Sequence, residues 1–249
     1  MMSLFALLKA YPKAAIGEHY HESEGNVVDS SPVVLELFTS QGCSSCPPAD
    51  ALLWQVQQEF SNDVFALSYH VDYWDYIGWK DPFAKSEYTQ KQRIYGEKFR
   101  SNSIYTPQMV VNGREHFVGS NRTELYSKIN AYKTYHAENT IEITNTEVAN
   151  GTITFSYAAI GNIDHKILRS VLVIDERVTQ VKRGENKNRN LKNSNIVVQE
   201  KYIELEHSSG ESSIHIPDIV TDDDGLTLML IVETANLDIT AACKREISH

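Results

Sequence analysis

The 249-residue sequence predicts an α/β domain followed by an antiparallel β-rich domain. Two apolar runs, 33–38 and 64–72, flank a helical pattern at 51–60, which is the order of a β-α-β unit with parallel strands. From residue 139 apolar and polar residues alternate instead, and no helical pattern follows residue 136. These changes divide the chain into a leader, an α/β domain and a β-rich domain, at 1–31, 32–137 and 138–249.

The remainder of the α/β domain shows three further patterns. Segment 73–100 is rich in aromatic residues, and its second half is helical in pattern. Asn112-Gly113 lies between two apolar runs, which indicates a hairpin with a type I′ turn. A last helix is expected over 122–136, with Ser120 or Asn121 as its cap.

The β-rich domain carries about six candidate strands. Asn150-Gly151 forms the turn between the first two of them. We expect a sandwich-like domain that packs against the α/β domain. The candidate strands are 140–144, 152–157, 168–174, 196–205, 213–216 and 226–232.

Composition and charge exclude several classes of function. A hydrophobic fraction of 41% and a charged fraction of 22% are typical of a globular protein. The net charge of −10 argues against a nucleic-acid partner, and no apolar run approaches the ~18 residues of a membrane span. One basic stretch, 182–192, is typical of a solvated loop.

Three cysteines do not make a disulfide-stapled scaffold. Cys43 and Cys46 pair by spacing, which leaves Cys243 alone as an expected small buried hydrophobe. Both paired cysteines lie on a strand-to-helix turn, where free N–H groups and the helix dipole favour a thiolate at Cys43. Pro47 and Pro48 remove two of those N–H donors.

A Cys-x-x-Cys pair between a strand and a helix, a parallel second strand and Thr106-Pro107 before a hairpin together resemble the thioredoxin fold. The resemblance implies that the Thr106–Pro107 bond is cis and lies beside the sulfurs. The runs 37–50, 70–83 and 105–108, with Gly184-Glu185-Asn186 and Arg189, are similar to a bacterial thioredoxin-like family known only as a domain of unknown function. In that family the 184–189 loop would reach the cysteine groove.

Members of this family are often secreted, which implies a periplasmic or secreted location. The apolar run after Met1 is interrupted at Lys9 and is shorter than the ~7–15 residues of a secretory signal. A cytoplasmic location is therefore the alternative.

The mechanism implied is thiol–disulfide exchange with a protein partner, without a cofactor or metal. Cys43, as the more exposed sulfur, attacks the partner disulfide, and Cys46 resolves the mixed disulfide. His70 is a candidate acid or base near Cys43, because its ordinary pKa lies near neutrality. The alternative is that His70 only satisfies hydrogen bonds at a strand end.

Other interpretations of the same residues stay open. Trp74, Trp79 and Asp72 are candidates for a substrate groove, although the tryptophans could equally fill the core of the insertion. The chain could be a redox-inactive binding module whose disulfide only braces a loop. A metal site built from Cys43, Cys46 and His70 is a weaker alternative, because only one Cys-x-x-Cys is present. The sequence indicates neither a particular substrate nor an oligomeric state.

Overall fold

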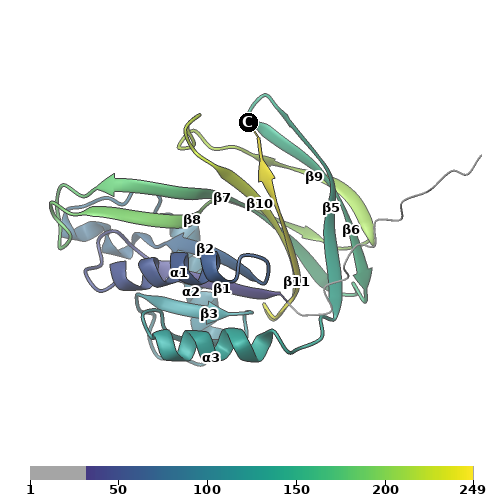
Figure 1. Ribbon diagram of the computed structural model, residues 1–249, viewed down its shortest axis with the longest axis horizontal. Helices are drawn as coiled ribbons and strands as arrows, with labels where there is room; N and C mark the ends of the chain where they lie inside the picture. The colour runs from purple at the N-terminus through teal and green to yellow at the C-terminus, as the bar shows by residue number, and fades with distance from the viewer. Residues whose placement is uncertain (1–31, 249) are drawn as a thin grey trace, which may run out of the picture.

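The computed structural model describes residues 32–248, so the predicted leader lies outside the described residues. The described chain is a mixed α/β structure with one large sheet and one small sheet (Figure 1). Its elements are β1 (Val33–Thr39), α1 (Pro47–Glu59), β2 (Val64–His70), the 3-10 helix η1 (Asp72–Ile77), α2 (Ser86–Lys98), β3 (Gln108–Val111), β4 (Glu115–Val118), α3 (Arg122–Tyr132), β5 (Asn139–Ala149), β6 (Thr152–Gly161), β7 (Lys166–Gln180), β8 (Asn190–Glu204), β9 (Ser209–His215), β10 (Leu226–Thr234) and β11 (Ile239–Ile247).

The large sheet contains the predicted β-α-β unit. Its strand order is β11-β10-β7-β8-β2-β1-β3-β4. β1 and β2 are parallel, with Val33 opposite Val64, which confirms the expected pairing. β3 runs antiparallel to β1 and forms the predicted hairpin with β4, whose turn places Asn112 and Gly113 at φ of 47° and 67°.

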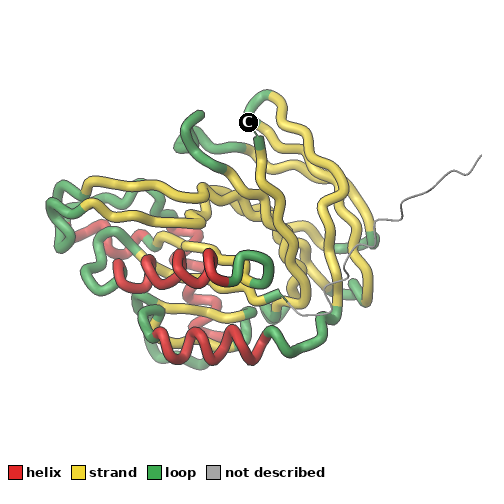
Figure 2. The backbone as a smooth tube through the Cα atoms, viewed as in Figure 1, coloured by secondary structure: helices red, strands yellow, loops and turns green. Residues whose placement is uncertain are grey.

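Only part of the β-rich region forms a sheet of its own. β8 pairs with β2 in parallel, with Ser68 opposite Ile196, and so adds β7, β10 and β11 to the large sheet. The edge of β2 presents unpaired N–H and C=O groups, and β8 satisfies part of them. Only β5, β6 and β9 form the separate antiparallel sheet, which packs against the large sheet across a shared apolar core (Figure 2).

Helices cover both faces of the large sheet. On one face α1 and α3 pack against β1 through residues such as Leu53, Ile129 and Leu37. On the other face α2 contributes Tyr88 and Tyr95 to a second core. The strands between them are buried on both faces, which explains why their sequences are continuous apolar runs.

Helix boundaries differ from the expected ones by a few residues. α1 begins at Pro47 rather than at residue 51, because proline is well suited to the first turn, where its missing N–H has no partner in any case. At the start of α3 the Asn121 side chain accepts from the Glu124 backbone and donates to its carboxylate, which confirms the predicted cap. α3 ends at Tyr132, earlier than expected.

A buried charge cluster joins the two halves of the chain. Arg169 on β7 is fully buried and contacts Glu36 of β1 at 2.7 Å and Glu233 of β10 at 3.0 Å. Its guanidinium also donates to the Tyr69 hydroxyl on β2. The charges are paired, as burial requires, and they tie β7 and β10 to the β-α-β unit.

Candidate functional site

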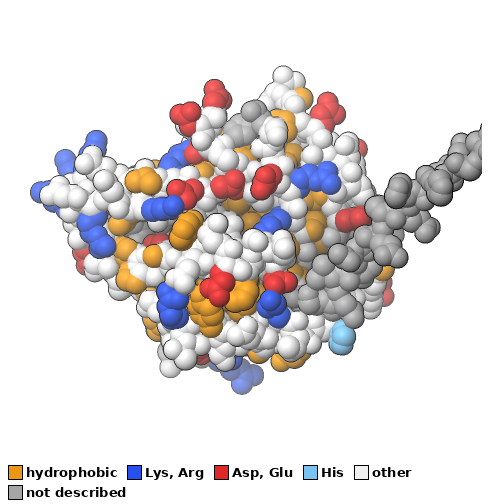
Figure 3. Space-filling model, in the orientation of Figure 1, with side chains coloured by type: hydrophobic (Ala, Val, Ile, Leu, Met, Phe, Trp, Pro, Cys, Tyr) orange, Lys and Arg blue, Asp and Glu red, His pale blue; other side chains and the backbone are white. Residues whose placement is uncertain are grey.

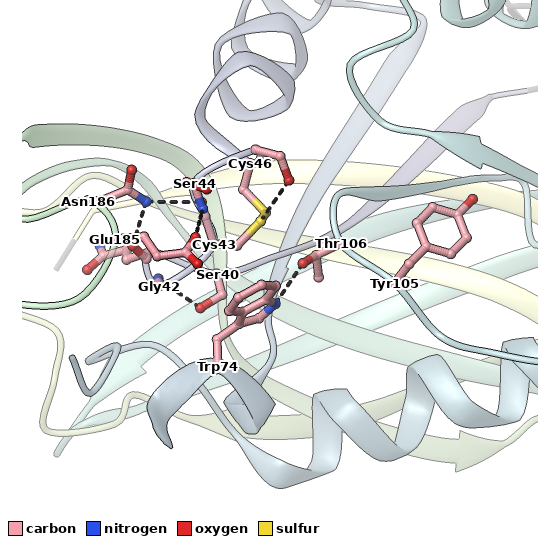
Figure 4. Close-up of a disulfide and its surroundings, with 12 residues drawn as sticks. Ser40, Gly42, Cys43, Ser44, Cys46, Trp74, Tyr105, Thr106, Glu185 and Asn186 are labelled. Carbon is pink, nitrogen blue, oxygen red and sulfur yellow. Dashed lines mark hydrogen bonds between the residues drawn. A yellow bond between two sulfur atoms is a disulfide. The ribbon is translucent and has the colours of Figure 1, made fainter. Parts of the chain in front are cut away.

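Cys43 and Cys46 lie in the segment between β1 and α1, where the sequence predicts them. They are disulfide-bonded, with Cα atoms 5.5 Å apart. Cys46 is the N-cap residue of α1, and its carbonyl accepts from the backbone of Ala49 and Asp50. The Cys-x-x-Cys pair is therefore fixed to the first turn of a long helix (Figure 4).

Both cysteines are fully buried, with 0% exposure each. The expectation that Cys43 is the more exposed sulfur is therefore wrong. Ser44 and Ser45, the two residues between the cysteines, are exposed. The burial arises because side chains distant in sequence pack around the disulfide.

The backbone N–H groups near Cys43 are largely engaged. The Ser44 N–H donates to the Glu185 carboxylate at 3.0 Å, and the Cys46 N–H donates to the Cys43 carbonyl at 3.3 Å. Because Pro47 and Pro48 have no N–H, the helix offers fewer donors to a thiolate than its position suggests. The polar neighbour of the Cys43 sulfur is the Ser45 hydroxyl at 3.4 Å.

The connection between β7 and β8, residues 181–189, is called the β7–β8 tip below. It lies against the cysteine segment, as the resemblance implies. Asn186 is fully buried, and its side-chain amide donates to the carbonyls of Gln41 at 2.9 Å and Cys43 at 3.0 Å (Figure 4). Its carbonyl oxygen accepts from Arg189. At Gly184 a Cβ atom would meet Ile77 and Trp79 within 3.4 Å, so the tip also packs on the aromatic insertion.

The residues proposed as a groove divide into two groups. Trp74 is half-buried and donates to the Thr106 hydroxyl at 2.8 Å, alongside the cysteine segment (Figure 4). Trp79 donates to the Gln41 side chain at 3.2 Å. Asp72 instead bonds to Thr89 of α2 and does not join them.

Thr106 and Pro107 lie at the entry to β3. The peptide bond between them is cis, which confirms the expected isomer. The Pro107 carbonyl accepts from Gly119 across the β3–β4 hairpin.

His70 ends β2 and is fully buried. Its Nδ1 lies 2.7 Å from the Asp81 carboxylate, which also accepts from the backbone N–H of Gln41 and Phe83. Burial lowers the pKa of His70, but the Asp81 charge outweighs it, and the pKa is raised. Burial likewise opposes ionisation of Asp81, yet His70 holds its pKa below the ordinary value. The Asp81 carboxylate therefore caps backbone N–H groups of two loops and forms an ion pair with His70.

Two buried polar residues near the cysteine segment, Gln41 and Asp50, carry no signal in the sequence. Asp50, on the first turn of α1, is buried near His70 and Asp81, and burial raises its pKa to about 7. Gln41 donates to Asn193 of β8 at 3.1 Å. Because aspartate is common in the first turn of a helix, its position in the sequence does not reveal that Asp50 is buried. The burial arises from the packing of β8 against this part of the chain.

Cys243 lies on β11, a strand that the sequence patterns did not predict. It is partly exposed rather than buried, and it lines a cavity of about 540 Å³ with Phe65 and Ile141. Its pKa is raised to about 12 by desolvation, so the thiol stays protonated.

Two kinds of feature are absent from residues 32–248. Within them no group of three or more His, Cys, Asp and Glu side chains is placed to hold a metal ion. No helix in the same part of the chain is long and apolar enough to cross a membrane.

The fold and site define a mixed α/β protein with a disulfide-bonded Cys-x-x-Cys pair at the start of a helix. The chain belongs to the family described as protein of unknown function (DUF1223), which it matches over residues 34–233. It is similar to the crystal structure of an Agrobacterium tumefaciens protein, with 28% identity and a TM-score of 0.66. That match covers 88% of this chain and 98% of the other.

Two glycosidases give much weaker matches. A β-glucuronidase from Ruminococcus gnavus has 10% identity and a TM-score of 0.25, over 45% of this chain and 16% of its own. A β-glucosidase from Kluyveromyces marxianus has 11% identity and a TM-score of 0.24, over 50% of this chain and 17% of its own. These similarities carry no argument about fold or function. None of the curated proteins compared with this chain matches it.

Proposed function

We propose that the protein is a thiol–disulfide oxidoreductase. Its reactive groups are Cys43 and Cys46, which belong to a thioredoxin-like unit formed by residues 32–137. The observation that carries the proposal is the disulfide between these cysteines in the segment between β1 and α1, with Cys46 as the N-cap of α1. Two sulfurs separated by two residues can form and break their bond with little movement of the backbone.

The proposed reaction begins with the reduced pair. The Cys43 thiolate attacks a partner disulfide, a bond forms to one partner sulfur, and the other leaves as a thiolate. The Cys46 thiolate then attacks Cys43, which restores the disulfide and releases the second partner sulfur. Two electrons pass to the partner, and its two thiolates take up protons. Because the pair is buried, the groups over Cys43 must move before the first attack.

The backbone N–H donors near Cys43 bear on whether the pair reduces or oxidises its partner. A couple is strongly oxidising when its reduced form is stabilised. Glu185 occupies the Ser44 N–H, and the prolines remove two further donors, so the thiolate receives little stabilisation from the helix. We expect a reduction potential nearer to about −270 mV than to about −120 mV, the range of known exchange proteins.

The test measures disulfide reduction with the Cys43→Ser and Cys243→Ser variants. Cys43→Ser should abolish the activity, whereas Cys243→Ser, which lies outside the site, should retain it. Retention of activity by Cys43→Ser would refute the exchange mechanism. The potential itself can be measured by alkylation and mass spectrometry across a thiol redox series.

The burial of Cys43 favours a second candidate, a binding module whose disulfide only braces the segment before α1. In that case the native pair would resist reduction throughout the same redox series. Rapid reduction only after unfolding in denaturant would support the binding module over the oxidoreductase.

A further inference from the structure

The β7–β8 tip lies directly against the cysteine segment, at the backbone of Cys43 and Ser44. Glu185 binds the Ser44 N–H, and Asn186 binds the Cys43 carbonyl. Ser44 and Ser45 are the exposed residues between the cysteines. A polypeptide that reaches the Cys43 sulfur therefore contacts both these serines and the tip.

The tip is basic although the chain as a whole carries a net charge of −10. Lys182, Arg183 and Lys187 are exposed, and none forms an ion pair with another residue in the range 32–248. Arg189 is also exposed and donates to Asn186. Figure 3 shows Lys and Arg side chains gathered at the end of the molecule where β7 and β8 meet.

The acidic groups of the same region do not neutralise these cations. Glu185 is the one carboxylate of the tip, and it is turned toward the Ser44 N–H. Glu176 is paired with Lys192 at 2.6 Å, further along the two strands. Lys182, Arg183 and Lys187 are thus left to act on a molecule outside the chain.

We propose that the β7–β8 tip is a recognition surface for an acidic polypeptide segment that carries the disulfide to be exchanged. This proposal rests on the proposed function, because the tip matters through its contact with Cys43. Four of the nine residues of the tip are cationic, which suits a segment that carries several carboxylates. A basic surface on an acidic protein also orients an acidic partner, since the remaining surface repels it.

If the tip recognises acidic segments, the protein should associate faster with an acidic peptide than with a basic one. Electrostatic steering raises association rates by roughly 10- to 1,000-fold, and the gain falls as salt screens the charges. We therefore expect the reduced protein to exchange with an acidic disulfide peptide at least about tenfold faster than with a basic one at low ionic strength. High salt should remove the preference.

The test uses two disulfide peptides of equal length that differ only in flanking Glu or Lys residues. The variant Lys182→Glu with Lys187→Glu should reverse the preference. The control is Arg114→Glu with Lys201→Glu, which makes the same change in net charge away from the disulfide. Arg114 follows β3 at the amino end of β1, whereas Cys43 follows its carboxyl end. Lys201 lies toward the far end of β8.

The outcomes separate this proposal from the proposed function. If Cys43→Ser abolishes exchange but the wild type shows no acidic preference, the tip is not the recognition surface and the oxidoreductase remains. The same conclusion follows if the tip variant and the control behave alike. If Cys43→Ser retains exchange, the proposed function fails. Binding of a cysteine-free acidic peptide by the wild type and the tip variant, measured by calorimetry, then decides whether the surface recognises acidic chains.

Discussion

Replacement of the buried carboxyl of Asp50 by an amide should change how stability depends on pH. Asp50 is 6% exposed, and burial raises its pKa from 3.8 to about 7. An amide of the same shape carries no charge at any pH. Asp50→Asn therefore removes the cost of ionising this position in the folded protein.

The magnitude follows from the pKa difference between the unfolded and folded states. Below about pH 4 both states hold the proton, and Asp50 contributes no pH dependence. As the pH rises toward 7, the unfolded chain releases its proton first, so the wild type loses stability at about 1.4 kcal/mol per pH unit. Over about three units the loss is about 4 kcal/mol, and above pH 7 it stays constant. Asp50→Asn should gain this amount relative to the wild type between about pH 4 and pH 8.

The assay is urea denaturation of the oxidised protein at several pH values across this range. The free energy of unfolding of Asp50→Asn is compared with that of the wild type and of Asp222→Asn, an exposed aspartate of the β9–β10 connection. The control should follow the wild type. If the free energy of unfolding changed with pH in the same way for Asp50→Asn and the wild type, the Asp50 carboxyl would titrate as an ordinary exposed group, and the reasoning would be refuted.

Two further substitutions test the packing. Arg169→Ala removes the cation that contacts both Glu36 and Glu233 and leaves Lys91, 3.7 Å from Glu36, as the remaining cation beside these carboxylates, so it should cost about 3–5 kcal/mol in chemical denaturation. A cost of about 0.5 kcal/mol or less, the usual size of a surface substitution, would contradict this view of the cluster. Gly113→Ala places a Cβ atom 1.7 Å from the Leu237 carbonyl oxygen at a φ of +67°. It should therefore cost at least about 2 kcal/mol more than Gly78→Ala, which also has a positive φ but open space around it. Equal melting temperatures for the two alanine variants would argue against the clash.

Local patterns account for the parts of the fold that depend on neighbouring residues. The apolar run of β1, the helical period of α1 and the apolar run of β2 follow each other within 38 residues, Val33–His70. The Asn112-Gly113 turn and the Asn121 cap are likewise set by residues that are adjacent or nearly so. Such features depend on backbone preferences that a short segment carries without help from the rest of the chain.

The continuation of the large sheet could not be predicted in this way. Alternating strands in 138–249 are equally compatible with a sandwich of their own and with the addition of strands to β2. The pairing of Ser68 with Ile196 selects the second arrangement. Strand patterns specify a buried face but not the neighbour along the sheet edge.

The position of Cys43 and Cys46 between a strand and a helix could be read from the sequence, because that placement is local. The burial of both sulfurs could not, nor could the contact of Asn186 with the Cys43 carbonyl from 143 residues away. The position of a basic loop beside the disulfide of an acidic protein is equally a product of long-range packing. These features depend on the pairing of β8 with β2 and of β7 with β8, and contacts at such separation leave no periodic signal in the chain.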